Sequence, residues 1–277
     1  MATTEQLEQA AREARPWVER GARLGAISRG VVYLALGGFS LQAAFGSRGQ
    51  PAGPGGVFEA IAPQTLGRPL LVALAVGLAG YAIWDLVRAA FDPYQRFSGA
   101  TRILQRLGWA VGGVISGLLG VTALRAAMST GHVAVDDEQA RGWTAAILAE
   151  PFGSWIIGVT GAVVISVGVV FVWQGWRADL DADLDATPTS ARVRRWTLNF
   201  GRFGMVARGI VLILIGVFLV VAVIHDNPAE ARGIAGALGV LARQPYGRWL
   251  LSIVATGFMS HGLYELLRAR YSRFRLF

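Results

Sequence analysis

A pattern that occurs three times in the chain limits its architecture more than any other feature. The copies occupy residues 24–93, 107–180 and 203–274, and each contains two long apolar segments. Glycines fall at the same offsets in every copy without gaps: Gly30, Gly113 and Gly209 at one offset, and Gly37, Gly120 and Gly216 at another. The period exceeds that of common solenoid units, which are about 20 to 50 residues long. The pattern therefore predicts a repeated pair of helices.

The apolar segments have the length of membrane-spanning helices. A bilayer core of about 30 Å requires about 20 apolar residues in a helix. Six segments meet this requirement: 27–45, 69–90, 108–128, 154–176, 204–225 and 248–269. They are apolar on all sides, whereas a soluble core would show amphipathic helices. We therefore expect an all-α polytopic membrane protein with six transmembrane helices that form three helical hairpins.

The repeat also predicts how the hairpins are arranged. Each copy has an even number of spans, so all copies enter the membrane in the same orientation and can surround an axis along the membrane normal. We therefore expect a pseudo-threefold bundle. In the first span of each copy the two repeated glycines are seven residues apart, on one helix face, where a neighbouring backbone can approach closely. These six glycines are predicted helix-packing positions.

Arginine placement predicts the orientation. All 26 basic residues are arginine, and positive charge is retained on the cytoplasmic side. With a cytoplasmic N-terminus, 19 arginines fall in inner segments and 7 in outer loops. Both termini are then cytoplasmic. The net charge of +8 then faces the anionic headgroups of the inner leaflet, which are the expected partner, with no nucleic acid.

The segments outside the repeats are expected on the cytoplasmic side. They are an amphipathic arm at 1–23, linkers at 94–106 and 181–202, and a tail at 275–277. The arm carries apolar residues at helical spacing, so we expect a helix on the membrane surface, with a loosely ordered tail as the alternative. Its acidic residues do not fit a signal peptide. The second linker, with Asp179 to Asp185 at alternating positions, lacks the calcium-loop pattern and is a possible docking place for a cytosolic or membrane protein.

Charged residues recur at matching positions near the inner ends of the spans. In the first spans the position holds Arg29, Gly112 and Arg208; in the second spans it holds Asp85, Phe171 and Glu265. Acid and base are thus lost together in copy two. A charge near hydrocarbon is costly unless it is paired, so joint loss is what an ion pair predicts.

We therefore expect two ion pairs, each inside one hairpin. Arg29 should contact Asp85, and Arg208 should contact Glu265. The alternatives are snorkelling of each arginine to the headgroups and local pairs with Arg88 and Arg268.

His261, Glu265 and Arg268 form a candidate polar stripe on the last span. A histidine inside a span can act as a proton relay or pH sensor. The alternative is a helix–helix hydrogen bond.

The outer loops each contain a short apolar stretch, at 56–62, 142–149 and 233–242. At about 1.5 Å per residue these stretches cannot span a bilayer. We interpret them as short interfacial or re-entrant helices that cap the outer face.

The composition excludes much chemistry. The chain has no cysteine and no lysine, which excludes disulfides, thiolate chemistry and a Schiff base to a cofactor. Its histidines, His132, His225 and His261, lack metal-ligand spacing. We find no nucleophile, base and oxyanion arrangement. The sequence therefore predicts no cofactor, no metal and no enzymatic activity.

Two sequence runs carry a resemblance to a known family. They are LARQPYGRWLL at 241–251 and GLAGYAIWDL at 77–86, within three tandem two-helix units. The chain resembles a bacterial integral-membrane family catalogued as a domain of unknown function, number 1206. The resemblance implies six spans in the plasma membrane and no established activity. Copy two departs from the pattern, with Val170 and Phe171 in place of the Trp84-Asp85 type of sequence.

Two classes of function fit these expectations. The first is a non-catalytic membrane module, a scaffold or accessory subunit, which agrees with glycine-rich packing faces and few charges in the spans. The second is a channel or transporter for an ion or small solute along the pseudo-threefold axis, which needs a shared polar cavity. An apolar centre favours the first class, and a continuous polar cavity favours the second.

Overall fold

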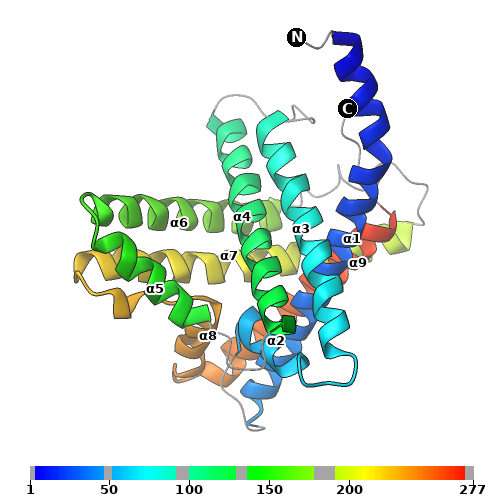
Figure 1. Ribbon diagram of the computed structural model, residues 1–277. Coiled ribbons are helices and arrows are strands. Elements are labelled where there is room, and N and C mark those ends of the chain that lie inside the picture. Colours follow the sequence, from blue (N-terminus) through cyan, green and yellow to red (C-terminus); the bar gives the residue numbers. More distant parts are fainter. Residues whose placement is uncertain (1–3, 47–51, 92–99, 129–135, 178–190, 272–277) are drawn as a thin grey trace.

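Six long helices make up most of the chain. The computed structural model describes residues 4–46, 52–91, 100–128, 136–177 and 191–271. The long helices are α1 (Thr4–Ala44), α3 (Gly67–Phe91), α4 (Ala100–Met128), α6 (Gly153–Arg177), α7 (Ala191–Ile224) and α9 (Gly247–Tyr271) (Figure 1). The short ones are α2 (Pro54–Ile61), α5 (Asp136–Leu148), α8 (Ile234–Ala242) and the 3₁₀ helix η2 (Pro228–Glu230). No strand occurs in these described ranges, so the all-α prediction is confirmed.

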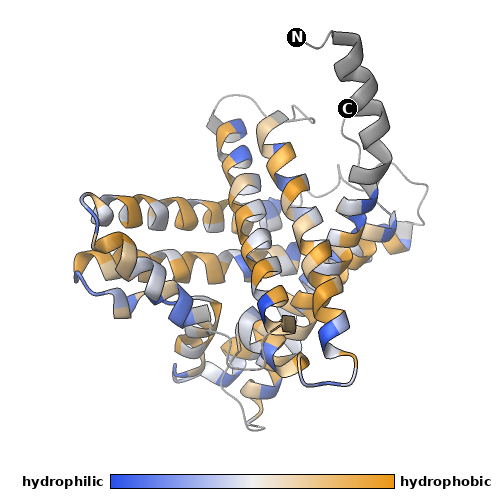
Figure 2. Ribbon diagram, viewed as in Figure 1, coloured by the Kyte–Doolittle hydropathy of each residue, from blue (hydrophilic) through white to orange (hydrophobic). Residues whose placement is uncertain are grey.

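Each long helix contains a segment able to cross a membrane. The segments are Arg20–Ala44, Gly67–Ala90, Arg106–Met128, Gly153–Arg177, Arg192–Ile224 and Gly247–Tyr271. Their surfaces are predominantly hydrophobic (Figure 2). On α6 two exposed tryptophans, Trp155 and Trp176, lie near the two ends. At about 1.5 Å per residue they are about 31 Å apart, which matches aromatic anchors at the two interfaces of a bilayer.

The N-terminal arm differs from the expected surface helix. Residues 4–23 are helical, but they continue into the first span as a single 41-residue helix, α1. The backbone has no break between arm and span, so the arm follows the axis of the span and projects beyond the other helices (Figure 1). The apolar periodicity predicted a helix in the arm. It did not show whether that helix lies along the membrane surface or continues the span, because this depends on whether the helix is interrupted at the span boundary.

The tightest helix pairs join neighbouring repeats. They are α3 with α4, α6 with α7, and α9 with α1. Within a repeat, α1 packs against α3 and α7 against α9, whereas α4 and α6 touch only marginally. The six helices therefore form a ring in which the last span closes on the first.

The three interfaces between repeats are equivalent. A Cβ placed on the first repeated glycine would meet residues at the same two positions of the neighbouring helix in every case: Gly262 and Leu266 for Gly30, Ala82 and Leu86 for Gly113, and Gly168 and Val172 for Gly209. The second repeated glycine behaves likewise, with Met259 for Gly37, Ala79 for Gly120 and Ile165 for Gly216. Close backbone approach at these six glycines supports the predicted pseudo-threefold arrangement.

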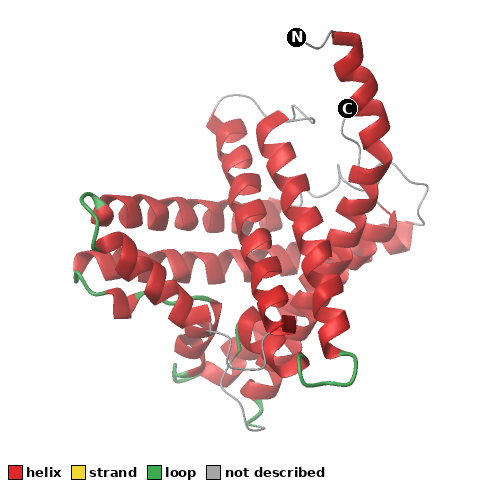
Figure 3. Cartoon of the chain, viewed as in Figure 1, coloured by secondary structure: helices red, strands yellow, loops and turns green. Residues whose placement is uncertain are grey.

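The short helices gather at one end of the bundle, which we call the helical cap. Helix α5 contacts both α2 and α8, and short loops lead from α2 into α3, from α5 into α6 and from α8 into α9 (Figure 3). Asp137 at the start of α5 accepts hydrogen bonds of 2.9 Å from the backbone N–H groups of Gly233 and Gly236, at the start of α8. A carboxylate is favourable at this position because helix N-termini carry free N–H groups and partial positive charge. The prediction of short capping helices is confirmed.

Glycine at the start of each second span has a steric reason. A Cβ at Gly67 would overlap the carbonyl oxygen of Ile61, at the end of the preceding short helix. Gly153 and Gly247 have the same relation to Ile147 and Ala242. Each turn from the cap into a span is therefore too tight for any larger residue, which accounts for the repeated glycine in the sequence.

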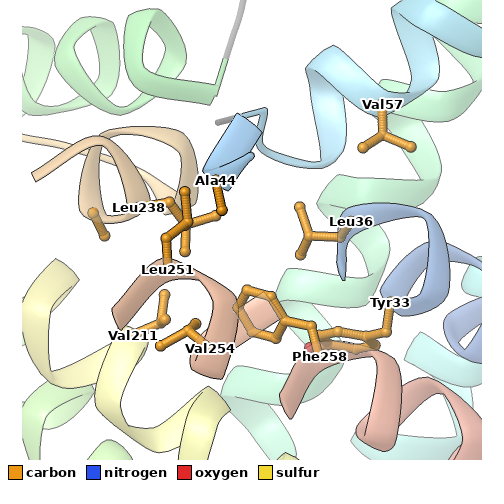
Figure 4. Packing of buried hydrophobic residues seen from close by; sticks show 10 residues of the cluster. Tyr33, Leu36, Ala44, Val57, Val211, Leu238, Leu251, Val254 and Phe258 are labelled. Carbon is orange, nitrogen blue, oxygen red and sulfur yellow. The ribbon is translucent and has the colours of Figure 1, made fainter. Parts of the chain in front are cut away.

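The part of the bundle next to the cap has an apolar core. Leu36 from α1, Val57 from α2, Leu238 from α8 and Phe258 from α9 are almost fully buried together (Figure 4). Val211 from α7 extends the cluster. The core thus joins the first repeat to the third and fills the space beneath the cap.

Repeat two is open where the other repeats are closed. Gly25 and Gly204 occupy equivalent positions on α1 and α7, and a Cβ on either would lie 2.5 to 2.6 Å from Tyr81 or His261 on the second helix of the same repeat. The equivalent position on α4 is Gly108, where a Cβ would have nothing from the described ranges within 4 Å. Helix α6 is accordingly the least buried span. We call this opening the α4–α6 gap.

Candidate functional site

A cluster of buried ionisable side chains lies where α1, α3 and α9 meet, toward the end of the bundle away from the cap. None of its members exposes more than 8% of its surface: Arg29, Asp85, Arg88, His261, Glu265 and Arg268. We call this set the charged centre. Ionisable groups buried in spans are functional candidates by default because their burial is costly.

The Asp85 carboxylate holds one half of the charged centre together. Its Oδ2 atom lies 3.6 Å from Nη1 of Arg29, and its Oδ1 atom lies 3.6 Å from Nη1 of Arg88. The structure thus brings Arg29 and Asp85 together across α1 and α3. The local pair on α3, considered as an alternative, is also present, so both arginines share one acid.

Glu265 has different partners from those expected. Its Oε1 atom lies 3.7 Å from Nε2 of His261, and its Oε2 atom lies 3.8 Å from Nη1 of Arg268, both on α9. These contacts bring the predicted polar stripe together. Among the described residues no ion pair joins Arg208 to Glu265, so the second predicted pair is wrong.

Arg208 lies against aromatic rings instead. Its guanidinium carbon is 4.9 Å from the ring centre of Phe171 and 5.7 Å from that of Tyr33. Helix α7 packs most extensively against α6, and this packing places Arg208 beside the α6 residue that matches Glu265 in the repeat. The position of Arg208 along its helix was predicted correctly. The neighbour that its side chain faces was not, because this depends on the rotation of α7 about its axis.

Tyr81 connects the two halves of the charged centre. Its hydroxyl accepts a hydrogen bond of 3.2 Å from Nη1 of Arg268, and the Arg29 guanidinium lies 4.3 Å from its ring centre. Tyr81 occupies the same repeat position as His261, and it was not among the site residues predicted from the sequence. An aromatic residue with a hydroxyl, one turn before a buried acid, was the available signal.

His261 is packed against aromatic residues rather than bound across a helix interface. Its ring meets that of Tyr33 edge to face at 4.7 Å and lies 6.1 Å from that of Tyr264. Neither ring nitrogen has a hydrogen-bond partner in the described part of the chain. The alternative of a helix–helix hydrogen bond at His261 is therefore wrong.

The uncharged residues of repeat two serve the charges of its neighbours. A Cβ on Gly112 would lie 3.0 Å from Oδ2 of Asp85, so glycine leaves room for that carboxylate. Phe171 in turn offers its ring to Arg208. The two uncharged positions of repeat two thus lie beside charged residues of repeats one and three and add no charge of their own.

Two arginines that were not predicted as site residues donate hydrogen bonds to carbonyl oxygens at helix ends near the charged centre. Arg106 on α4 donates to the carbonyl oxygens of Ala89 and Ala90, at 2.6 and 2.8 Å. Arg202 on α7, at the same repeat position, donates to those of Gly175 and Trp176, at 3.2 and 3.0 Å. Cations are favourable at helix C-termini, where carbonyl groups lack partners.

Several predicted positions contribute nothing to this site. Within the described ranges no three His, Cys, Asp or Glu side chains gather as a metal site. His132 and the stretch from Asp179 to Asp185 lie outside the described residues, as does the part of the possible partner-docking linker before residue 191.

These features define a class: a multi-pass membrane protein of three repeated helical hairpins around a buried charged centre. The chain belongs to the family described as Domain of Unknown Function (DUF1206), which matches residues 24–92, 107–178 and 203–272. The matches coincide with the three hairpins, so the resemblance seen in the sequence is confirmed. The chain is 31% identical over 259 residues to "Uncharacterized protein YxxB" of Bacillus subtilis (strain 168), covering 94% of this chain and 93% of that protein. No solved structure matches the chain.

Proposed function

We propose that this protein is a non-catalytic membrane module, a scaffold or accessory subunit that binds other membrane components. The observation that carries the proposal is the filled interior beneath the cap. There, the apolar side chains of Leu36, Val57, Leu238 and Phe258 are almost fully buried together. A permeation path requires polar groups or a wettable constriction along its length.

The surface of the bundle also supports a binding role. Among the spans, α4, α6 and α7 have the smallest buried shares. Helix α6 exposes large apolar residues such as Trp155, Ile156 and Val159. Apolar exposure of this kind is ordinary toward lipid, but it also leaves repeat two as the part of the ring most accessible to another membrane component.

We further propose a plasma-membrane location with both termini in the cytoplasm and the helical cap outside. The arginine distribution, 19 against 7, supports this orientation. Reporter domains fused after residue 277 and inserted in the cap loop near Gly67 test it. Activity of a cytoplasm-specific reporter at the C-terminus and of a periplasm-type reporter in the loop is expected, and the opposite pattern would refute the proposal.

The module proposal is tested by transport and by isolation of the assembly. Liposomes that contain the purified protein should release trapped ions and small solutes no faster than protein-free liposomes. The protein extracted under mild conditions should retain a second protein in a fixed ratio, identified by mass spectrometry. Selective solute release with no retained protein would show that the module proposal is wrong.

A channel or transporter is the second candidate, and the charged centre is the observation that favours it. Buried acids and a histidine in spans occur in proton and ion pathways. In that case Glu265→Gln should alter solute release from liposomes, whereas the exposed-surface variant Glu150→Gln should not. If the protein is a non-catalytic module, neither variant should change solute release from liposomes.

A further inference from the structure

Arg208 is a half-buried arginine in a span, and the described part of the chain offers it no acidic partner. Among the described residues, no carboxylate lies within ion-pair distance of its guanidinium, which instead faces the rings of Phe171 and Tyr33. Arg29, at the equivalent position of repeat one, has Asp85 at 3.6 Å. Cation–π contacts offset only part of the cost of an unpaired charge near hydrocarbon. A bound anion would supply the missing partner.

The surroundings of Arg208 place it in the interior of the ring. Phe171 belongs to α6, and Tyr33 belongs to α1, so the arginine extends from α7 between two helices on either side of it. His261 from α9 packs edge-on against Tyr33 and is 3% exposed. Its Nδ1 atom has no hydrogen-bond partner among the described residues. Arg208 and His261 both lie against the ring of Tyr33, so a cation and a buried imidazole lie close together.

The α4–α6 gap is the least closed part of the ring of helices around this place, because α4 and α6 touch only marginally. Arg208 corresponds to Gly112 in repeat two, and Gly108 lies one helical turn from Gly112, away from the cap. Among the described residues, nothing lies within 4 Å of a Cβ on Gly108. The α4 side of the gap therefore has free space one turn from the position that matches Arg208.

We propose that Arg208 binds the phosphate group of an anionic phospholipid that enters through the α4–α6 gap. A guanidinium matches phosphate oxygens with two parallel charge-assisted hydrogen bonds. The unpartnered Nδ1 atom of His261 is available for a further polar contact. Lipid is favoured over a free anion because the opening faces the bilayer, where an acyl chain fills it, and because the arginine-rich side of the protein attracts anionic lipids. This inference goes beyond the module function and does not depend on it.

Lipid retention by the purified protein tests the proposal. Detergent-solubilised protein is mixed with phosphatidylglycerol or phosphatidylcholine, and bound lipid is counted by native mass spectrometry. Arg208→Gln should lower the affinity for phosphatidylglycerol about tenfold or more, as expected when charge-assisted hydrogen bonds are lost. The matched control is Arg248→Gln, whose guanidinium also faces an aromatic ring, that of Phe45 at 4.8 Å, but at the cap end of α9.

Three results would overturn the proposal. They are equal retention of phosphatidylglycerol by Arg208→Gln and the unaltered protein, equal retention of the two lipids by the unaltered protein, and stabilisation by inorganic phosphate without lipid retention. The last result would assign the site to a free anion.

A second variant tests the α4–α6 gap as the route of entry and leaves Arg208 unchanged. Gly108→Phe should fill the gap and reduce phosphatidylglycerol retention, while the bundle stays folded because the added ring meets open space. Gly38→Phe on α1 is the matched control, because a Cβ there also has nothing within 4 Å. Unchanged retention by Gly108→Phe, with both variants eluting as folded protein, would exclude the gap as the route. Failure of both lipid tests would leave the module proposal standing, because liposome release tests that proposal separately.

Discussion

Repeats one and three are closed hairpins with buried charges, whereas repeat two is open and carries none of these charges. The same glycine position is crowded at Gly25 and Gly204 and unoccupied around Gly108. Yet the paired glycines of repeats two and three make the same contact with the preceding repeat, and those of repeat one make it with repeat three. The comparison shows that the contacts between repeats are the constant part of the fold. Closure of a hairpin is a separate feature, and it occurs together with the charged centre.

The largest expected effect on stability follows from removing the interhelical partner of Asp85 in repeat one. Arg29→Ala leaves a carboxylate that is only 4% exposed without its interhelical partner. We expect a loss of about 3 to 5 kcal/mol in the free energy of unfolding, the range for removing one member of a buried pair. Unfolding of the detergent-solubilised protein in increasing SDS measures it.

A residue of repeat two provides a comparison. Gln174 corresponds to Arg88 and Arg268 of the charged centre, and Gln174→Ala should cost much less than Arg29→Ala because it leaves no buried charge behind. Double-mutant cycles add a second check. Arg29 and Asp85 should be strongly coupled, whereas Arg208 and Glu265 should be nearly additive. Strong coupling between the latter two would contradict the geometry described for α7.

The next effect concerns the crowded and open glycines. Gly25→Ala and Gly204→Ala should each destabilise the protein by about 1 to 3 kcal/mol, because the new methyl group overlaps the facing helix. Gly108→Ala should be neutral or stabilising by up to about 1 kcal/mol, since alanine favours helix and the site is empty. Thermal unfolding of the three variants side by side decides this. Equal destabilisation by all three would mean that repeat two is closed.

The smallest effect concerns a feature common to repeats two and three. Arg106→Ala and Arg202→Ala each remove hydrogen bonds to the end of the preceding helix. We expect a loss of about 1 to 2 kcal/mol for each in the free energy of unfolding. Arg195→Ala, at an exposed position on α7, serves as control. A difference of more than twofold between the effects of Arg106→Ala and Arg202→Ala would show that the two helix ends are not fastened alike.

The repeat, the six spans and the capping helices could be predicted from the sequence because each depends on local pattern. Hydropathy gives the length of a span, and coincident glycines such as Gly30 and Gly113 give the repeat unit. Residue counting also placed Arg29 and Asp85 at similar depth, and the structure brings them together. These inferences require only the rise per residue and the cost of buried charge.

The error at Arg208 shows where such reasoning ends. Depth does not specify which neighbouring helix a side chain faces, because that depends on helix rotation and on the order of helices around the ring. The decisive fact is that a first span packs most tightly on the second span of the preceding repeat, which places Arg208 beside Phe171. The open α4–α6 gap also has no local signal, since Gly108 reads as one more packing glycine.

The pairing of α1 with α9 has a consequence for biosynthesis. The first span emerges from the ribosome well before the last, yet its most extensive helix partner is that last span. Until α9 is inserted, Arg29 has Asp85 nearby, but the apolar face around Leu36 lacks Phe258 and the seam at Gly30 lacks Gly262. The ring therefore cannot be completed during synthesis, and a truncated chain would present an unfinished first helix to the membrane's quality-control proteases.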